Sequence, residues 1–381
     1  MSITTAPDYD SKKPYRPKIR MHNPPIPEAI LNRCVLIKKF QSNQNEINEE
    51  VDPMGLINKY KPHILNRFNV NRYLPDDHRA IQSYRDVLTI PAEQVPIFSA
   101  PQLNTLFPAL PPNEIPQPKY SSLLPILIPA QAADIDFYQY DIVSERNSLL
   151  KIASTHKECI VGVVRCGKTL FLRRYDRRRA NQNDAGYQFE RMCTPGYDLE
   201  VEYKYLIEGY IGNFQTLITA QVHSVSEDDG LPIELKCPEL KCSRSNCPQL
   251  KCPELKCLEG DGKLHLDEKW LQMFLGGVEK LKVGLRSGGR SAQLLQIVPY
   301  DAANMVDVNI KINFLRYLNQ VLLFLQDNVQ EARSYLLCRY RHDESSRDMD
   351  LFLYEVTDRE DMQTLEFVPN WMLKKLQIRN T

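Results

Sequence analysis

The order of strand-like and helix-like segments predicts a mixed α/β fold for this chain of 381 residues. Two apolar runs of strand character, 159–164 and 169–173, lie on either side of a Cys-Gly-Lys turn sequence. Residues 312–329 carry apolar side chains at spacings of three and four, which is typical of a helix packed on a sheet. The runs 335–338 and 351–354 indicate a closing pair of strands. Strands and helices are therefore expected to alternate after residue 140.

Composition limits the class of protein. The chain has 48 Lys and Arg against 48 Asp and Glu, so any contact with nucleic acid must come from a local basic patch. The first residues lack the charged-then-apolar order of a secretory signal, and no apolar run approaches the ~18 residues of a membrane span. We therefore expect a soluble, intracellular protein with no membrane partner. Its ten cysteines are expected to be thiols.

Domain boundaries follow from proline and charge. Residues 1–29 are rich in Pro, Lys and Asp with little apolar periodicity, which indicates a disordered or peripheral N-terminal arm. Residues 30–381 are expected to form a single domain that opens with a strand at 30–40. Ten prolines between residues 90 and 130 argue against a long helix or a central strand. This segment is predicted to wrap extended over the surface, and docking of a partner is the alternative.

Residues 162–169 satisfy the pattern of a phosphate-binding P-loop letter by letter. That chemistry needs a glycine-rich loop followed by a helix, whereas here β-branched residues fill the loop and apolar alternation follows Thr169. We therefore expect Cys166-Gly167-Lys168 to form the turn of a hairpin.

Five arginines follow that hairpin, at positions 173, 174 and 177–179. A solvated surface and contact with RNA phosphates are both open for them. Residues 184–192 then suit a helix that carries Glu190 inward. Residues 264–281 have helical spacing as well and carry Gln272.

A tandem repeat of Glu-Leu-Lys-Cys-Pro occupies residues 234–257, with cysteines every five residues from Cys237. Structural zinc sites pair cysteines two to four residues apart, so this spacing favours an expanded surface loop at 237–257 over a zinc site. Glu239 and Glu254 each follow a proline, which is unsuited to a central strand. Glu234 is therefore the preferred acid of the Glu-x-Lys candidates.

A series of motifs resembles the decapping and exoribonuclease (DXO) family between about residues 140 and 375. The matching segments are Arg146-Asn147-Ser148-Leu149-Leu150, Gly186-Tyr187-Gln188-Phe189-Glu190, the apolar run Leu217 to His223, Glu234-Leu235-Lys236, Lys269 to Leu275, and Phe367-Val368-Pro369-Asn370-Trp371. Members of that family remove defective 5′ caps or pyrophosphate from RNA, and some degrade the exposed RNA. The resemblance implies two curved, mostly antiparallel sheets packed together with flanking helices.

The resemblance also implies a metal-dependent nuclease site. If the runs 217–223 and 231–236 pair, Gln221 and His223 share one sheet face with Glu234 and Lys236, because alternate residues of a strand point the same way. Glu190 would then arrive from its helix.

Two of the implied metal-ligand positions are unsuited to that chemistry. The family pattern has a glutamate and an aspartate where this chain has Gln221 and His223. Neutral glutamine does not offset the dehydration of Mg²⁺ as a carboxylate does, and neutral histidine suits softer metals. We therefore expect Glu190 and Glu234 to be the remnant of a weak or lost metal site, with no residue competent for catalysis. Glu200 and Glu202 are the reserve acidic pair.

The favoured interpretation is a pseudoenzyme without a cofactor. It would bind RNA 5′ ends through Arg146, Lys236, Gln272, Arg177 and Arg178. An acid-poor site of this kind is similar to the Cutoff group of insect proteins, which implies a nuclear role at germline piRNA loci with nuclear, chromatin-linked protein partners.

Two alternatives stay open. One is an active decapping nuclease, pyrophosphohydrolase or 5′-3′ exoribonuclease with Mg or Mn, since Glu190, Glu234 and Lys236 are in place. The other is a protein-interaction scaffold that binds no RNA, suggested by the zero net charge and the proline-rich segment.

Overall fold

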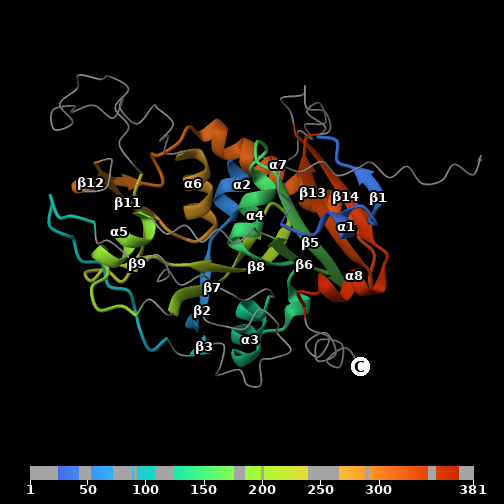
Figure 1. Cartoon of the computed structure of the whole chain (residues 1–381), viewed down its shortest axis with the longest axis horizontal. Helices are drawn as coiled ribbons and strands as arrows, with labels where there is room; N and C mark the ends of the chain where they lie inside the picture. Colours follow the sequence, from blue (N-terminus) through green and yellow to red (C-terminus); the bar gives the residue numbers. More distant parts are fainter. Residues whose placement is uncertain are drawn as a thin grey trace, which may run out of the picture.

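The computed structural model describes residues 25–42, 53–71, 88–89, 92–107, 123–175, 185–198, 201–238, 266–287, 292–341 and 349–368. Within these ranges the strands form two sheets, with the large one beneath the helices α4 and α7 and the small one beside α5 (Figure 1). No helix in these ranges has the length and apolar character needed to cross a membrane.

The large sheet contains ten of the described strands. Their order is β1 (Val35–Lys39), β14 (Asp350–Val356), β13 (Ser334–Tyr340), β5 (Cys159–Cys166), β6 (Thr169–Tyr175), β4 (Ile142–Glu145), β8 (Phe214–Gln221), β7 (Val201–Ile211), β2 (His63–Asn71) and β3 (Leu88–Thr89). Strand β4 runs parallel to β6 and β8, and the other neighbouring pairs are antiparallel.

The small sheet contains four described strands. Their order is β12 (Leu294–Asp301), β11 (Lys280–Arg286), β10 (Pro232–Lys236) and β9 (Ser224–Val225). Strands β10 and β11 are parallel, and the other two pairs are antiparallel. The predicted fold class, a mixed α/β domain with two mostly antiparallel sheets and flanking helices, is confirmed.

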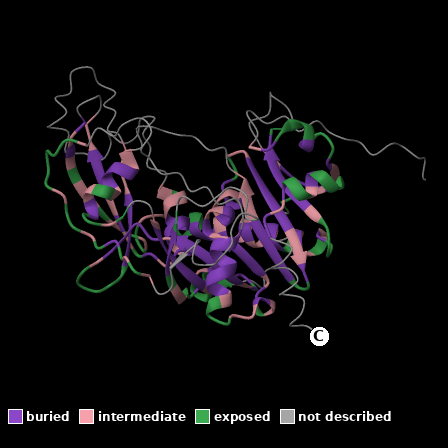
Figure 2. Cartoon of the chain, turned by 60° about the horizontal axis from the view of Figure 1, so that its bottom comes forward, coloured by how far each residue is buried: buried purple, intermediate pink, exposed green. Residues whose placement is uncertain are grey.

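Helices cover both faces of the large sheet. The described helices are α1 (Glu28–Leu31), α2 (Pro53–Lys59), α3 (Leu124–Ala132), the 3-10 helix η3 (Phe137–Gln139), α4 (Arg146–Ala153), α5 (Ala185–Cys193), α6 (Leu266–Leu275), α7 (Val308–Asn328) and α8 (Arg359–Thr364). Successive side chains of a strand point to opposite faces of the sheet. Ile142 and Ile218 pack with α4, α6 and α7 on one face, while Val143 and Leu217 pack with α3 on the other. The central strands are therefore buried on both sides (Figure 2).

The chain passes directly from one sheet to the other at the end of β8. Val222 and His223 alone separate β8 of the large sheet from β9 of the small sheet. Helix α6 joins the two sheets in a second way, since Trp270 packs in the large-sheet core and Met273 packs against the small sheet. Polar residues on β10, on α6 and at this crossing are therefore brought together.

Several sequence predictions are confirmed. Strands β5 and β6 form the expected hairpin, with Cys166 opposite Thr169 and Gly167 at a φ of 58°, so residues 162–169 are not a P-loop. Helices α5 and α7 lie where the sequence predicted them. Strands β13 and β14 form the closing antiparallel pair.

Other predictions are wrong in part. The strand at 30–40 begins only at Val35, after the turn of α1. The helix at 264–281 is cut short, because Gly277 adopts a φ of 64° and the chain continues as β11. Residues 124–132 are not an extended wrap but the helix α3, which is apolar on all sides and buried in the core. Pro125 lies in its first turn, where the backbone donates no hydrogen bond within the helix, whereas Pro129 lies inside the helix.

The expected pairing of the runs 217–223 and 231–236 is also wrong. Strand β8 lies in the large sheet and β10 in the small one, and β10 pairs instead with β9 and β11. The predicted arm at 1–29 and the loop at 237–257 lie largely outside the described residues, and the single-domain boundary stays a prediction.

Helix α5 is seated on the small sheet through a glycine. Phe189 is fully buried, and its ring lies over Gly284 of β11 so closely that a methyl group there would overlap it. We predict that Gly284→Ala lowers the free energy of unfolding by about 1–3 kcal/mol through overpacking. Denaturant unfolding measures this change. A Gly284→Ala/Phe189→Leu double variant should lose less than the sum of the single variants, and strict additivity would contradict the explanation.

Candidate nucleic-acid interface

A buried carboxylate on β10 lies at the centre of a polar cluster. Ile233 and Leu235 point into an apolar cluster with Phe189, so Glu234 points from the opposite face of the strand, towards α6. The Glu234 side chain is only 1% exposed. A charge so far from water is costly unless other groups compensate it.

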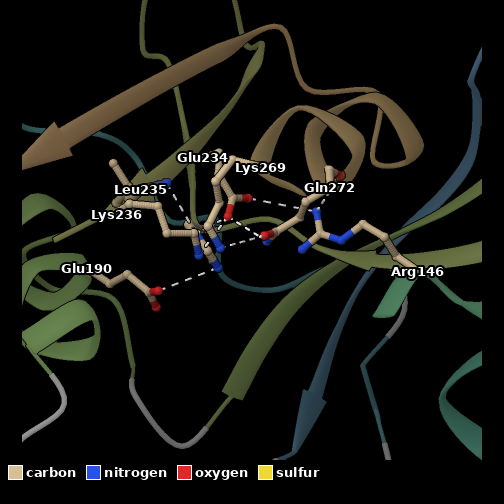
Figure 3. Close-up of polar contacts among 8 residues, drawn as sticks. Arg146, Glu190, Glu234, Leu235, Lys236, Lys269 and Gln272 are labelled. Carbon is tan, nitrogen blue, oxygen red and sulfur yellow. Dashed lines mark hydrogen bonds and ion pairs between the residues drawn. The ribbon is translucent and has the colours of Figure 1, made fainter. Parts of the chain in front are cut away.

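Three side chains from three elements donate to or neutralise Glu234 (Figure 3). Gln272 of α6 donates its Nε2 to Oε1 at 2.6 Å, and Lys236 of β10 places Nζ 2.9 Å from the same oxygen. Arg146, the first residue of α4, lies 3.8 Å from Oε2. Burial acts to raise the pKa of Glu234, but its interactions with His223, Lys236 and Arg146 outweigh burial and hold that pKa well below its ordinary value.

His223 lies between the two carboxylates of the site. Its Nδ1 is 3.3 Å from Glu234 and accepts the backbone N–H of Leu235 at 3.2 Å, while its Nε2 is 3.5 Å from Glu190 of α5. Burial lowers the pKa of His223, so the ring is neutral. Since Nδ1 accepts an amide proton, the ring proton is on Nε2 and faces Glu190.

Gln272 is oriented by a lysine one turn earlier in α6. Lys269 donates from Nζ to Oε1 of Gln272 at 3.3 Å, which leaves the amide nitrogen of Gln272 for Glu234. Burial, reinforced by the nearby charge of Lys236, lowers the pKa of Lys269 to about 8. Lys269 opens the motif segment Lys269 to Leu275, but no role in the site was predicted for it. Its spacing of three from Gln272 on a predicted helix was the available signal, since such residues share a face.

Arg146 reaches Glu234 past a glycine. Its Nη1 atom lies 3.5 Å from the carbonyl oxygen of Gln272, and a Cβ at Gly276 would come within 2.8 Å of Nη1. Gly276 therefore leaves the space that the guanidinium occupies. Burial lowers the pKa of Arg146, but arginine remains charged at neutral pH.

The structure brings together six of the predicted site residues: Arg146, Glu190, His223, Glu234, Lys236 and Gln272. Gln221 ends β8 opposite Lys204 and makes no side-chain hydrogen bond or ion pair to these six within the described residues.

The remaining predicted residues are elsewhere. Glu202 of the reserve acidic pair is buried on β7, and its carboxylate lies 3.2 Å from Nζ of Lys204. Glu200, Arg177 and Arg178 lie outside the described residues.

The comparisons with known proteins agree with the motif resemblance. The family model described as RAI1-like PD-(D/E)XK nuclease matches residues 102–373. The chain belongs to this family. A comparison with curated proteins gives no match.

Solved structures of low sequence identity share the fold of this family member. Rai1 from Scheffersomyces stipitis, in complex with 3′-NADP⁺ and calcium, has a TM-score of 0.58 at 16% identity, covering 84% of this chain and 95% of that one. Rai1 from Candida albicans, in complex with pU5 and Mn²⁺, has 0.56 at 14%, covering 84% and 96%. Rai1 from S. pombe with 3′-FADP has 0.55 at 14%, covering 77% and 93%. None of these matches tests the resemblance to the Cutoff group, which stays a prediction.

The side chains present fit a pair of divalent metal ions poorly. The described residues contain no group of three or more His, Cys, Asp and Glu side chains arranged to hold a metal. Glu234 faces Gln272, Lys236 and Arg146. Neither nitrogen of His223 has a lone pair available for a metal, because Nδ1 accepts the Leu235 amide and Nε2 carries the ring proton. Hard cations require several carboxylate oxygens, and Glu190 alone leaves too few.

Removing the Glu234 charge should destabilise the fold. We predict that Glu234→Gln costs about 3–5 kcal/mol at neutral pH, because Arg146 and Lys236 would lose their buried counter-ion. Denaturant unfolding provides the measurement. Glu279→Gln, an exposed acid in front of β11, is the matched control and should change the free energy of unfolding by less than about 0.5 kcal/mol.

The same carboxylate predicts a pH dependence. Its folded pKa is below its unfolded value, so its contribution is complete above the unfolded value of ~4.3 and is lost as the pH falls towards the folded pKa. Stability should therefore fall below about pH 4 less steeply in Glu234→Gln than in the unmodified protein. Identical pH profiles would contradict this account of the cluster.

Proposed function

We propose that this chain is a catalytically degenerate member of the DXO and RAI1-like family that binds RNA 5′ ends without cleaving them. One observation carries the proposal: Glu234, the acid best placed to hold a metal, is instead neutralised by Lys236, Arg146 and the amide of Gln272. Metal-assisted phosphodiester cleavage needs carboxylates that are open to the cations. The cations and amide donors that remain are suited to phosphate oxygens.

The ligands in the solved relatives support the choice of RNA. Candida albicans Rai1 was solved with pU5 and Mn²⁺, and Scheffersomyces stipitis Rai1 with 3′-NADP⁺ and calcium. We propose that this chain also binds a phosphate-bearing ligand, but without a metal ion. Arg146, Lys236 and Gln272 would contact phosphate, and Arg177 and Arg178 are proposed to extend the contact along the RNA.

A second candidate is an active 5′-end decapping nuclease or pyrophosphohydrolase with Mg or Mn. It is favoured by the presence of Glu190, Glu234 and Lys236 within one cluster. It requires Glu234 to exchange at least one of its present donors for a metal. Hydrolysis of capped or 5′-phosphorylated RNA in Mg²⁺ or Mn²⁺, abolished by Glu234→Gln, would establish it and overturn the binding-only proposal.

The cellular setting is proposed from the resemblance to the Cutoff group. We place the chain in the nucleus, at germline piRNA loci, with chromatin-linked protein partners, where binding of 5′ ends would control the fate of nascent transcripts. A tagged chain should then be found in germline nuclei and crosslink to piRNA precursor transcripts. Exclusion from the nucleus would refute this part and leave the biochemical proposal standing.

The binding proposal predicts affinity for RNA that does not depend on metal. A single-stranded RNA with a 5′ monophosphate should bind equally well in EDTA and in Mg²⁺, and it should remain intact. Lys236→Gln should weaken binding by about 10- to 100-fold, since a hydrogen bond to a charged group contributes about 1.5–3 kcal/mol. Fluorescence anisotropy and gel analysis of the recovered RNA measure both effects.

The control substitution is Lys280→Gln on the neighbouring strand β11. Lys280 is paired with Asp229 and lies outside the cluster, so its loss should leave the affinity nearly unchanged. Equal weakening by Lys236→Gln and Lys280→Gln would indicate nonspecific electrostatic binding. No binding to any RNA would favour the scaffold interpretation.

A further inference from the structure

The members of the cluster differ in their access to solvent. Glu234, His223 and Arg146 have side chains no more than 6% exposed. The side chains of Glu190 and Lys236 are 22% and 23% exposed, and Lys269 is partly exposed as well. A ligand that approaches the cluster therefore meets these last three residues first.

The three positive charges of the cluster are not equally compensated. Lys236 is in direct contact with Glu234 at 2.9 Å, and Arg146 lies within 3.8 Å of the same carboxylate. Lys269 makes no ion pair with an acid of the described chain, and its one hydrogen bond there goes to the neutral amide oxygen of Gln272. With His223 neutral, the three cations face the two carboxylates Glu190 and Glu234. Glu268 also acts on Lys269, but it is itself paired with Lys157, so one positive charge at Lys269 is left without a partner of its own.

An uncompensated ammonium in such a position is costly. Its surroundings disfavour the charge, as the lowered pKa of Lys269 indicates. An anion that enters the cluster would remove this cost. A metal cation would increase it, because it would add charge of the same sign.

We propose that Lys269 receives the terminal phosphate of an RNA 5′ end and sets a preference for 5′-phosphorylated over 5′-hydroxyl RNA. This inference rests on the proposed function, and it names the chemical group that the site selects. A terminal phosphate monoester carries about −1.5 to −2 charges at pH 7, whereas each internal diester carries one. The excess charge at Lys269 therefore favours the terminal group, and a 5′ end without a phosphate gains nothing from it.

Gln272 and Glu190 would define the geometry of this recognition. Gln272 fixes Lys269 on one side through its amide oxygen and Glu234 on the other through its nitrogen. Glu190 is the partly exposed acid of the cluster. Its carboxylate lies 3.5 Å from His223 Nε2 and is thus directed towards the imidazole ring. The phosphate would bind between Lys269 and Lys236, on the side away from Glu190.

The test compares two RNAs of one sequence, with a 5′ phosphate or a 5′ hydroxyl, in EDTA. The unmodified protein should prefer the phosphorylated RNA by about tenfold, the effect of ~1.4 kcal/mol from one charge-assisted contact. Lys269→Met should abolish the preference, because it weakens binding of the phosphorylated RNA more than binding of the hydroxyl RNA. Lys269→Arg should keep the preference, because it retains the charge.

A measurement on the unmodified protein guards against a folding defect in the variants. Labelling by an amine-reactive reagent, followed by mass spectrometry, should show Lys269 protected by the phosphorylated RNA and not by the hydroxyl RNA, with Lys280 as the unprotected control. A preference that survives in Lys269→Met, or equal protection by both RNAs, would overturn the inference alone. Failure of both RNAs to bind the unmodified protein would overturn the proposed function together with it.

Discussion

The compensation of one buried charge is the constraint on which this site depends. Glu234 of β10 is buried and carries its negative charge. The groups that compensate this charge are Lys236 of β10 itself, Gln272 of α6 and Arg146 of α4. An unpaired carboxylate in that position would be neutralised by protonation or would destabilise the fold. The contacts of Glu234 therefore stabilise the fold in addition to any role in ligand binding, because they connect the small sheet to α4 and α6.

The topology explains why residues far apart in the sequence meet at this carboxylate. The two-residue crossing from β8 to β9 places His223 between the sheets, and pairing of β9 with β10 then brings Glu234 beside it. Helix α6 carries Gln272 and Lys269 down to the same point, and its end at Gly276 leaves room for Arg146. The cluster is thus a consequence of how the two layers are joined.

Local patterns in the sequence predicted the positions of helices and strands better than the pairing between strands. The hairpin at 166–169 follows from β-branched residues around a single glycine, and α7 follows from its apolar stripe. The motif resemblance located most of the cluster, although the strand pairing assumed for it was wrong. The pairing of β9 with β10 and the burial of the Glu202–Lys204 pair depend on contacts between distant segments, which periodicity does not report. The role of Lys269 could not be predicted from the sequence, because it depends on which acids lie near it in the folded chain.

The energetics of the cluster argue against a relic retained for packing alone. Replacing a buried ion pair with apolar residues of similar volume is often neutral or stabilising, so a fold kept only for its core has no need of such charges. Yet Arg146 is buried with its Nε lacking a hydrogen-bond partner in the described structure, and Lys269 lacks a carboxylate. Buried polar atoms without a partner call for an explanation, and a ligand that supplies acceptors is one such explanation for the donors here. A phosphate group has enough oxygens to serve several donors at once, which is why the arrangement favours a binding site over an inert remnant.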